Sequence, residues 1–242
     1  LYYGIPILIL MITRSPIAVL EQVATRPVLS AARTSIIAAS VTTSIATFLG
    51  VPLAYWLART DPRTATIVTA LVILPLVLPP TVSGIVLLTV VGPNTILGDI
   101  AGSVGISLTR SLAGVIIAQT FVASPFVIVT ARAAFEDVDV QLEQASRSLG
   151  KRQWTTFRRV TLPLAWPGII AGMTLTFARA LGEFGATLML AYYPRTLPVQ
   201  IWIAFLESGL EDAYPAAILL LIIAIGVLVI LNWIGTNPWS NG

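Results

Sequence analysis

Long stretches without Asp, Glu, Lys or Arg dominate the pattern of polar and apolar positions along this chain. They cover residues 1–13, 34–58, 64–98, 111–131, 160–178 and 213–242. Each internal stretch comes close to or exceeds the roughly 20 residues that an α-helix needs to cross about 30 Å of hydrocarbon. The apolar residues run continuously instead of alternating with a period of two, which favours helices over the strands of a β-barrel. The pattern therefore predicts an all-α, polytopic membrane protein.

The stretches predict about six transmembrane helices in a single membrane domain that covers residues 1–242. The expected spans are about 1–13, 31–58, 65–91, 111–135, 164–190 and 213–234. The first stretch is short and begins at Leu1, so it is either the remainder of a sixth span or a segment that lies on the membrane surface. It has neither the basic region nor the cleavage site of a signal peptide. We take it as a span.

Three prolines interrupt the expected third span, in the sequence Leu74-Pro75-Leu76-Val77-Leu78-Pro79-Pro80. A proline removes a backbone donor and clashes with the preceding turn, so this helix is expected to be kinked or broken near the middle of the membrane. The carbonyl groups freed there need a neighbouring helix or water. Two interpretations of Pro79 and Pro80 stay open, namely a broken helix beside a transport pathway and a kink that serves packing alone.

The distribution of basic residues indicates the orientation, because Lys and Arg are enriched in cytoplasmic loops. Segments 59–63 and 132–159 carry eight, namely Arg59, Arg63, Arg132, Arg147, Lys151, Arg152, Arg158 and Arg159. The segments on the other side carry five, namely Arg14, Arg26, Arg33, Arg110 and Arg195. Unless the imbalance is due to chance, the first two segments are cytoplasmic, and six spans then place both termini in the cytoplasm as well.

The composition agrees with a membrane location and restricts the chemistry. Apolar residues make up 56% of the chain and charged residues 10%, whereas soluble domains carry about 25% charged residues. His and Cys do not occur, which removes the commonest general base and metal ligand as well as all thiolate and disulfide chemistry. An intramembrane enzyme is therefore disfavoured. A secondary transporter needs coupling groups near the middle of the membrane, and only Arg179 and Glu183 qualify.

The connection between the fourth and fifth spans is much longer than a simple reversal of the chain requires. Its apolar residues Val138, Leu142, Ala145 and Leu149 recur at helical spacing, which predicts a short amphipathic helix with one apolar stripe. Gly150 follows directly, where a left-handed residue would end the helix. A further turn of helix with Trp154 and Phe157 leads into the fifth span. We expect a compact helical knob, residues 138–159, that projects into the cytoplasm.

This connection resembles the cytoplasmic loop of permease subunits of ATP-binding-cassette importers. The family pattern is Glu-Ala-Ala, three residues, Gly, nine residues, Ile, one residue and Leu-Pro. The chain reads Gln144-Ala145-Ser146, Gly150, Val160 and Leu162-Pro163 with every spacing kept. It departs from the pattern at Gln144, Ser146 and Val160, while Glu143 stands one position before Gln144.

The resemblance implies a type I importer fold, in which two copies of this subunit form a pathway, two ATPase subunits dock below, and an extracytoplasmic binding protein delivers an anion. Segment 137–161 would couple the chain to the ATPase. The implied coupling residues are Leu142, Glu143, Gln144, Ala145, Ser146, Leu149, Gly150, Val160, Leu162 and Pro163. ATP and Mg would bind to the partner, since the pair Gly150-Lys151 is followed by Arg152 and not by Ser or Thr. No cofactor, metal or nucleic acid is expected on this chain.

Three other segments resemble the permeases of molybdate importers, namely residues 74–82, 177–190 and 197–202. Sulfate and thiosulfate permeases share much of segment 179–186. The resemblance extends over nearly the whole chain from about residue 28. It implies import of a tetrahedral oxyanion across the cell membrane of a prokaryote, with molybdate first and tungstate, sulfate and thiosulfate as alternatives.

Arg179 and Glu183 are the charged residues that stand out within the expected spans, four residues apart on one helix face. Each costs about 2.5–3.5 kcal/mol at the centre of a span, so both should face protein or water. They either neutralise each other as an ion pair, or Arg179 lines the pathway or its gate and offers positive charge to the anion. Gly168 and Gly172 form a small face on the same span, which we expect to pack within the subunit.

Overall fold

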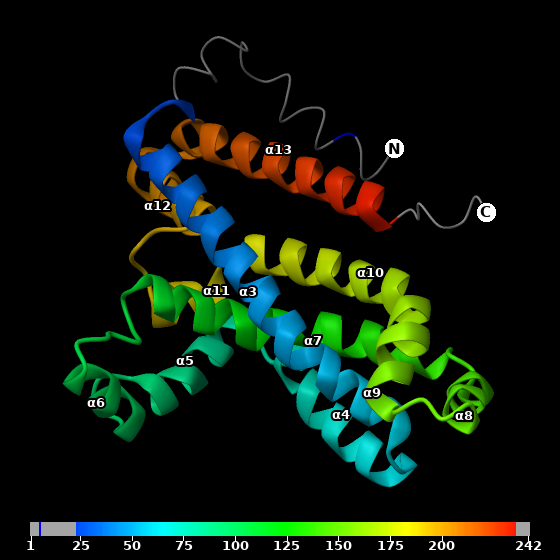
Figure 1. Cartoon of the computed structure of the whole chain (residues 1–242). Helices are drawn as coiled ribbons and strands as arrows, with labels where there is room; N and C mark the ends of the chain where they lie inside the picture. Colours follow the sequence, from blue (N-terminus) through cyan, green and yellow to red (C-terminus); the bar gives the residue numbers. More distant parts are fainter. Residues whose placement is uncertain (1–4, 6–22, 236–242) are drawn as a thin grey trace.

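The computed structural model describes residue 5 and residues 23–235, and the regular elements in this part of the chain are all helical (Figure 1). The expected span at 1–13 lies outside the described residues except for Ile5. The elements are α3 Arg26–Arg59, α4 Pro62–Val77, α5 Pro80–Val91, α6 Ile96–Ser103, α7 Leu112–Glu136, α8 Val140–Ser148, α9 Gln153–Thr156, the π-helix η1 Phe157–Thr161, α10 Leu162–Leu181, α11 Gly185–Leu190, α12 Leu197–Ser208 and α13 Leu210–Gly235.

The core of the molecule forms where α3, α7 and α10 pack against one another (Figure 1). Small residues on α3, such as Ala38 and Ala54, are fully buried, which lets the helix backbones approach closely. Larger apolar side chains fill the end of this core where α3 and α7 stop, among them Leu57, Phe135 and Ile169. The ends of α3 and α7 and the start of α10 therefore form one rigid end of the bundle.

The glycine face of α10 packs against α7, as expected for contacts within the subunit. A Cβ atom added to Gly168 would lie 2.4 Å from the Cβ atom of Ala134, and one added to Gly172 would lie 2.0 Å from the Oγ1 atom of Thr130. Both distances are far below van der Waals contact. Glycine at these positions is what allows α7 and α10 to lie side by side.

Four helices in the described part of the chain are long and apolar enough to cross a membrane. They are Arg26–Arg59, Leu112–Glu136, Gln153–Leu181 and Leu210–Val227, where the third joins α9, η1 and α10. Helices α4 and α5 together pass the same test but are bent by 114° at the break between them. The count is therefore four, or five if this bent pair forms one span.

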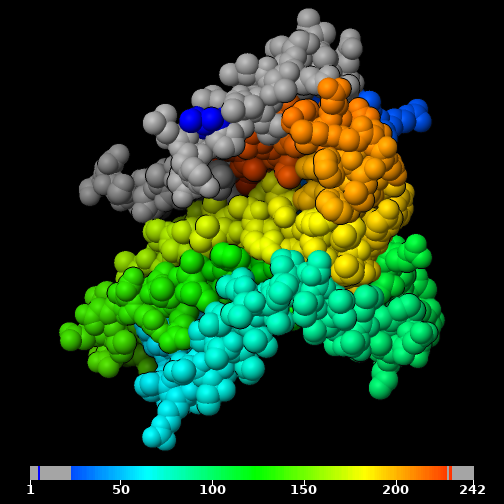
Figure 2. Space-filling model, turned by 180° about the vertical axis from the view of Figure 1, so that it is seen from behind, coloured from blue at the N-terminus to red at the C-terminus, as the bar shows by residue number. Residues whose placement is uncertain are grey.

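The predicted break in the third span is confirmed at Leu78 and Pro79. Leu78 has the extended backbone that a following proline favours, and Pro80 begins α5 in the first-turn position that suits proline. The pair does not form one straight helix over 65–91, because α5 turns away and packs against α11. Figure 2 shows from behind that α4 and α5 diverge and leave a notch between them.

The expected fifth span, 164–190, is also divided. Helix α10 ends at Leu181, and Gly182, Glu183 and Phe184 separate it from the short helix α11. The Glu183 carboxylate accepts a hydrogen bond from the amide of Ala186 (2.8 Å), in the first turn of α11. A charged side chain that caps a new helix explains why a continuous apolar run does not form a continuous span. Beyond α11 the chain forms α12, which packs against α13.

Candidate functional site

The knob between α7 and α10 is built around α8, and its ends follow the sequence closely. The Asp139 side chain accepts a hydrogen bond from the amide of Gln141 (2.8 Å) and so caps the start of the helix. At the other end Gly150 has φ = 78°, and its amide donates to the carbonyl of Arg147 (2.9 Å). The predicted left-handed stop at Gly150 is thus confirmed, and it turns the chain back toward α9.

Most of the predicted apolar stripe of the knob faces away from the bundle. The side chains of Leu142 and Leu149 are 48% and 80% exposed, and Ala145 is exposed as well. Val138 is the exception and the prediction was wrong there, because this residue precedes α8 and lies buried in the core beside Phe135. The chain thus presents an apolar helix face that none of its described residues covers.

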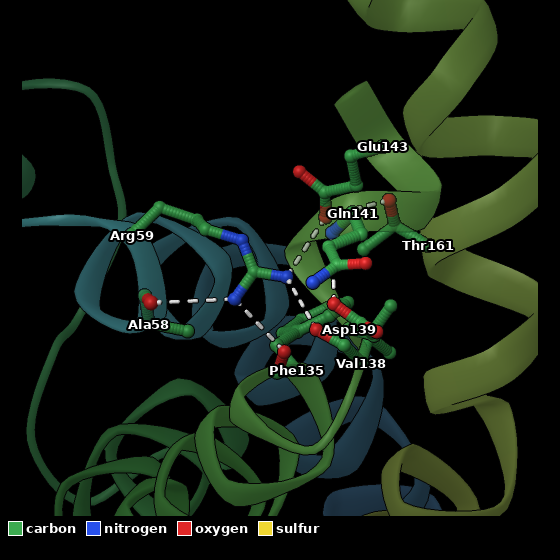
Figure 3. A network of polar contacts seen from close by, with 8 residues as sticks. All are labelled: Ala58, Arg59, Phe135, Val138, Asp139, Gln141, Glu143 and Thr161. Carbon is green, nitrogen blue, oxygen red and sulfur yellow. Dashed lines mark hydrogen bonds and ion pairs between the residues drawn. The ribbon is translucent and has the colours of Figure 1, made fainter. Parts of the chain in front are cut away.

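Glu143 lies on the opposite, inner face of α8 and is buried (Figure 3). Its Oε1 atom accepts hydrogen bonds from the guanidinium of Arg59 (2.8 Å) and from the hydroxyl of Thr161 (2.9 Å). These partners stand at the end of α3 and at the end of η1. One carboxylate therefore ties the knob to two different helices, and a charge-assisted bond of this kind is stronger than a neutral one.

Arg59 extends this network to the end of α7. Its guanidinium also donates to the carbonyl groups of Phe135 (2.9 Å) and Val138 (3.3 Å), which lie at the end of α7 and just beyond it. Sequence reasoning used Arg59 only as one basic residue among several in a cytoplasmic segment. No local signal could identify it, because its carboxylate partner lies 84 residues away.

An aromatic cluster packs the α9–η1 part of the knob against α3 and α7. The ring of Tyr55 lies 5.3 Å from that of Phe135 and 4.8 Å from that of Phe157, measured between ring centroids. The hydroxyl groups of Ser146 and Thr156 are 2.9 Å apart, within hydrogen-bond distance. Polar and aromatic contacts therefore hold α8 and α9 at a fixed position relative to α3 and α7.

The remaining residues of the predicted coupling set divide into two groups. Gln144 lies exposed on α8, beside the apolar face. Val160, Leu162 and Pro163 lie where η1 passes into α10, and Leu162 packs against the core. The motif thus combines a surface helix with the connection that joins this helix to a membrane span.

The second candidate site lies near the other end of α10. Arg179 and Glu183 form an ion pair of 2.5 Å, in which the Glu183 side chain is 1% exposed and that of Arg179 is 27% exposed. The expected ion pair is therefore present. Arg179 still keeps part of its surface open, which is the property that a role in the pathway would need.

The structure brings this ion pair close to the break between α4 and α5. A Cβ atom added to Gly185 would lie 2.9 Å from the Cβ atom of Pro80, so the start of α11 touches the start of α5. Likewise, a Cβ atom on Gly84 would lie 2.6 Å from the Cβ atom of Met189. Pro79 and Pro80 are exposed at this junction. Two broken helices thus meet where the sequence places its few intramembrane charges.

The structure offers no site for a metal ion among the residues described, since no three His, Cys, Asp or Glu side chains gather there. The exposed charges of the knob are mostly basic: Arg147, Lys151, Arg152, Arg158 and Arg159. At the nearby turn between α3 and α4, hydrogen bonds from the backbone amide and the hydroxyl of Thr64 hold the pKa of Asp61 below its usual range. The knob itself therefore carries more exposed basic residues than exposed carboxylates, of which it has Asp139.

Comparison with other proteins gives consistent matches over nearly the full length. A probable molybdenum ABC transporter permease of Haloferax volcanii is 56% identical over 99% of this chain and 88% of its own length. A molybdate/tungstate transport system permease of Thermococcus kodakarensis is 38% identical over 96% and 90%. A molybdenum transport system permease of Mycobacterium tuberculosis is 39% identical over 82% and 75%.

Solved structures agree in fold. One chain of a bacterial alginate ABC transporter superposes with a TM-score of 0.79 at 14% identity, over 100% of this chain and 91% of that one. A chain of an inward-facing methionine ABC transporter gives 0.68 at 19% identity, over 86% and 94%. A profile of one transporter family matches residues 46–237, the segment that contains the knob and both broken helices. The chain is thus an integral membrane protein that belongs to the family of inner membrane components of binding-protein-dependent transport systems.

Proposed function

We propose that this chain is the membrane-spanning subunit of an ATP-driven importer of molybdate, with tungstate as a second cargo. The observation that carries the proposal is the exposed apolar face of α8 on a knob that the rest of the chain holds in place. Such a face needs a partner, and the relatives that share this chain over nearly its full length are named as permeases of molybdenum or of molybdate and tungstate.

The transport complex would contain two copies of this chain, two ATPase subunits and an extracytoplasmic binding protein. The knob would lie in the cytoplasm, where Leu142 and Leu149 enter a groove of the ATPase and Gly150 allows a close backbone approach. ATP and Mg would bind to the ATPase, and this chain would carry the anion across the membrane of a prokaryote, with both termini in the cytoplasm.

The geometry suggests how movement of the ATPase reaches the pathway. A displacement of α8 passes through Glu143 to Arg59 on α3 and to Thr161 on η1. The helix that begins at η1 continues through α10 to Arg179. The coupling knob and the junction of the two broken helices therefore lie at opposite ends of one helix, so that ATP-driven motion at one end changes the packing of α5 against α11 at the other.

Co-purification with the ATPase tests the coupling role. Leu149→Ser removes the most exposed apolar side chain of the face, so it is expected to release most of the ATPase while the permease stays folded. The control Arg63→Ser changes an exposed residue of α4 near the same end of the bundle. Full retention of the ATPase by Leu149→Ser, or equal loss in both variants, would contradict the assignment.

Uptake by the reconstituted complex tests the cargo and the role of Arg179. Molybdate accumulation should require ATP and should be suppressed by tungstate more strongly than by sulfate or thiosulfate. Accumulation without the ATPase would favour a secondary transporter instead. For Arg179→Gln, normal uptake per folded molecule together with a smaller folded fraction would leave the ion pair a structural role only, whereas lost uptake at normal folding supports a role in the pathway.

A further inference from the structure

A groove of about 770 Å³ runs along the outside of the core, between α3 and the helix formed by α9, η1 and α10. This volume lies within the range of about 300–1,000 Å³ that is usual for ligand sites. Aromatic and aliphatic side chains make up most of its wall: Phe48, Val51, Tyr55, Trp154, Phe157 and Trp166. The groove is separate from the exposed face of α8, none of whose residues lines it.

The position of the groove along the helices matches one leaflet of a bilayer. It extends from Thr47 to Tyr55 on α3, which is about 12 Å at 1.5 Å per residue. Half of a hydrocarbon core of about 30 Å is of similar depth. Arg152 and Gln153, which belong to the knob, line the groove at the end marked by Tyr55. Apart from Thr47, the groove is thus apolar over a length that suits hydrocarbon chains, and its one charged lining residue, Arg152, lies at the end that would meet the headgroups.

The charges at this end of the groove are unbalanced. Arg152 lines the groove, and Lys151, Arg158 and Arg159 are exposed in the same short segment. Among residues 23–235, none of these four forms an ion pair with a carboxylate. The nearby carboxylate of Glu143 is already bound to Arg59. The positive charge at the mouth of the groove is therefore available to an anionic group from outside the chain.

Aromatic side chains at the groove agree with a position at the membrane surface. Trp154 is 68% exposed and stacks on Phe157 with 5.6 Å between the ring centroids. Trp166 is also exposed. Tryptophan is enriched at the level of lipid headgroups, because its ring is apolar while its N–H group can still donate a hydrogen bond.

We propose that this groove binds one anionic phospholipid from the leaflet on the side of the knob. Its hydrocarbon chains lie between α3 and α10 against Phe48, Val51 and Trp166, and its phosphate accepts hydrogen bonds from Arg152. An ATPase that meets the knob from water can reach its exposed residues at the mouth of the groove, but not Phe48 and Val51, which lie farther along α3 at hydrocarbon depth. The bound lipid holds α9 against α3 and so supports the knob from the side opposite to Glu143. This inference does not depend on the cargo.

Lipid retention by the full-length chain, purified with its ATPase partner, tests the proposal. The complex is equilibrated in detergent with equal amounts of phosphatidylglycerol and phosphatidylcholine, and bound lipid is counted by native mass spectrometry. We expect one phosphatidylglycerol per permease chain, and about fivefold less retention in Arg152→Gln, since a basic residue near the surface contributes about 1 kcal/mol toward an anionic lipid. The control Arg63→Gln removes the same charge outside the groove and should keep its lipid.

A second measurement identifies the occupant directly and does not depend on affinity. Benzoylphenylalanine in place of Trp154 should form a photo-adduct with the mass of a lipid. Adducts with residues 1–22 of the chain, with a second permease copy or with the ATPase would overturn the proposal. Equal retention of the two lipids, or equal retention by Arg152→Gln and Arg63→Gln, would also overturn it. Uptake and ATPase retention are measured in separate experiments. If the lipid experiments gave a negative result, the proposed transport function would therefore not be affected.

Discussion

Among the residues that the structure describes, two Arg–Glu pairs with a buried carboxylate have the same chemistry but lie at opposite ends of the bundle. Arg179 and Glu183 belong to one segment and meet across a single helical turn, at the junction of the two broken helices. Arg59 and Glu143 come from helices 84 residues apart and meet at the knob. The first pair neutralises charge where the chain crosses the membrane, whereas the second fixes the relative positions of several elements.

The surroundings of the pairs explain this difference. Glu183 is almost completely buried, and besides Arg179 it accepts one hydrogen bond, from the amide of Ala186. Glu143 keeps more contact with solvent, but its partner Arg59 also binds two carbonyl groups at the end of α7. Loss of the first pair should therefore reduce stability most, while loss of the second should reduce coupling most.

The largest effect on stability is expected for Arg179→Leu. It leaves the buried carboxylate of Glu183 without its cation, which costs about 3–5 kcal/mol when one partner of a buried pair is removed. Unfolding of the detergent-solubilised protein by heat or denaturant measures the loss. The double variant Arg179→Leu/Glu183→Leu should recover most of it, and a loss below about 1 kcal/mol in the single variant would show that water reaches the carboxylate.

A smaller loss of stability, about 2–3 kcal/mol, is expected for Arg59→Leu, since water can reach part of Glu143 while charged hydrogen bonds to two carbonyl groups disappear. Transport should suffer more than stability. The measurement is ATP hydrolysis and uptake by the complex at a temperature where the variant is folded. Hydrolysis that continues with little uptake supports the coupling role of Arg59, and normal uptake would refute it.

Thr161→Val should cost about 1 kcal/mol, because it removes one hydrogen bond to a carboxylate that keeps its arginine. Its distinctive effect is on the knob, since α8 then remains tied to α3 and loses its tie to η1. Proteolysis between residues 147 and 153 measures the mobility of the knob. Thr161→Ser keeps the hydroxyl group and should behave as the natural protein, so faster cleavage of both variants would point to packing and not to the hydrogen bond.

The smallest effect is expected for Glu136→Gln, within about 0.5 kcal/mol. This side chain forms a third Arg–Glu pair, with Arg132 (2.7 Å), but it is 45% exposed, and surface pairs contribute little. The same unfolding measurement provides the reference for the two buried pairs. If Glu136→Gln lost as much stability as Arg179→Leu, burial of the carboxylate would not explain the order of the stability losses among the three pairs.

The sequence was sufficient for the features that depend on local pattern. The stop at Gly150 and the break at Pro79 each follow from residues within a few positions of one another. The spacing of Arg179 and Glu183 likewise allowed an ion pair, while a place of Arg179 in the pathway stayed open. The inward position of Glu143 could not be predicted in this way, because its partner at Arg59 becomes a neighbour only after α3, α7 and η1 have packed together. The helical spacing of the apolar stripe also led to a wrong prediction for Val138. This residue was assigned to the exposed apolar face, but it precedes α8 and is buried in the core.

Hydropathy likewise does not reveal where an apolar run is interrupted. Residues 164–190 form one apolar run, yet the chain leaves α10 at Gly182 because Glu183 binds the first turn of α11. A scale that averages over a window treats one glutamate as a small loss of apolarity. The effect of Glu183 depends instead on where its carboxylate points, since it accepts a hydrogen bond from the first turn of α11 and so favours the start of a new helix there.

The continuous helix that passes through the π-helical turn Phe157–Thr161 gives a physical reason to expect a fixed number of residues between Gly150 and Leu162-Pro163. Nearly all residues of this interval belong to one uninterrupted helical path from α9 through η1 into α10. On such a path each inserted or deleted residue rotates everything beyond it by about 100°. A single insertion would turn α8 around the axis of α10 and aim its apolar face elsewhere. The number of residues in this helical interval therefore sets the direction of the apolar face of α8. A flexible loop would tolerate an insertion, whereas an insertion here is expected to weaken binding of the knob to the ATPase.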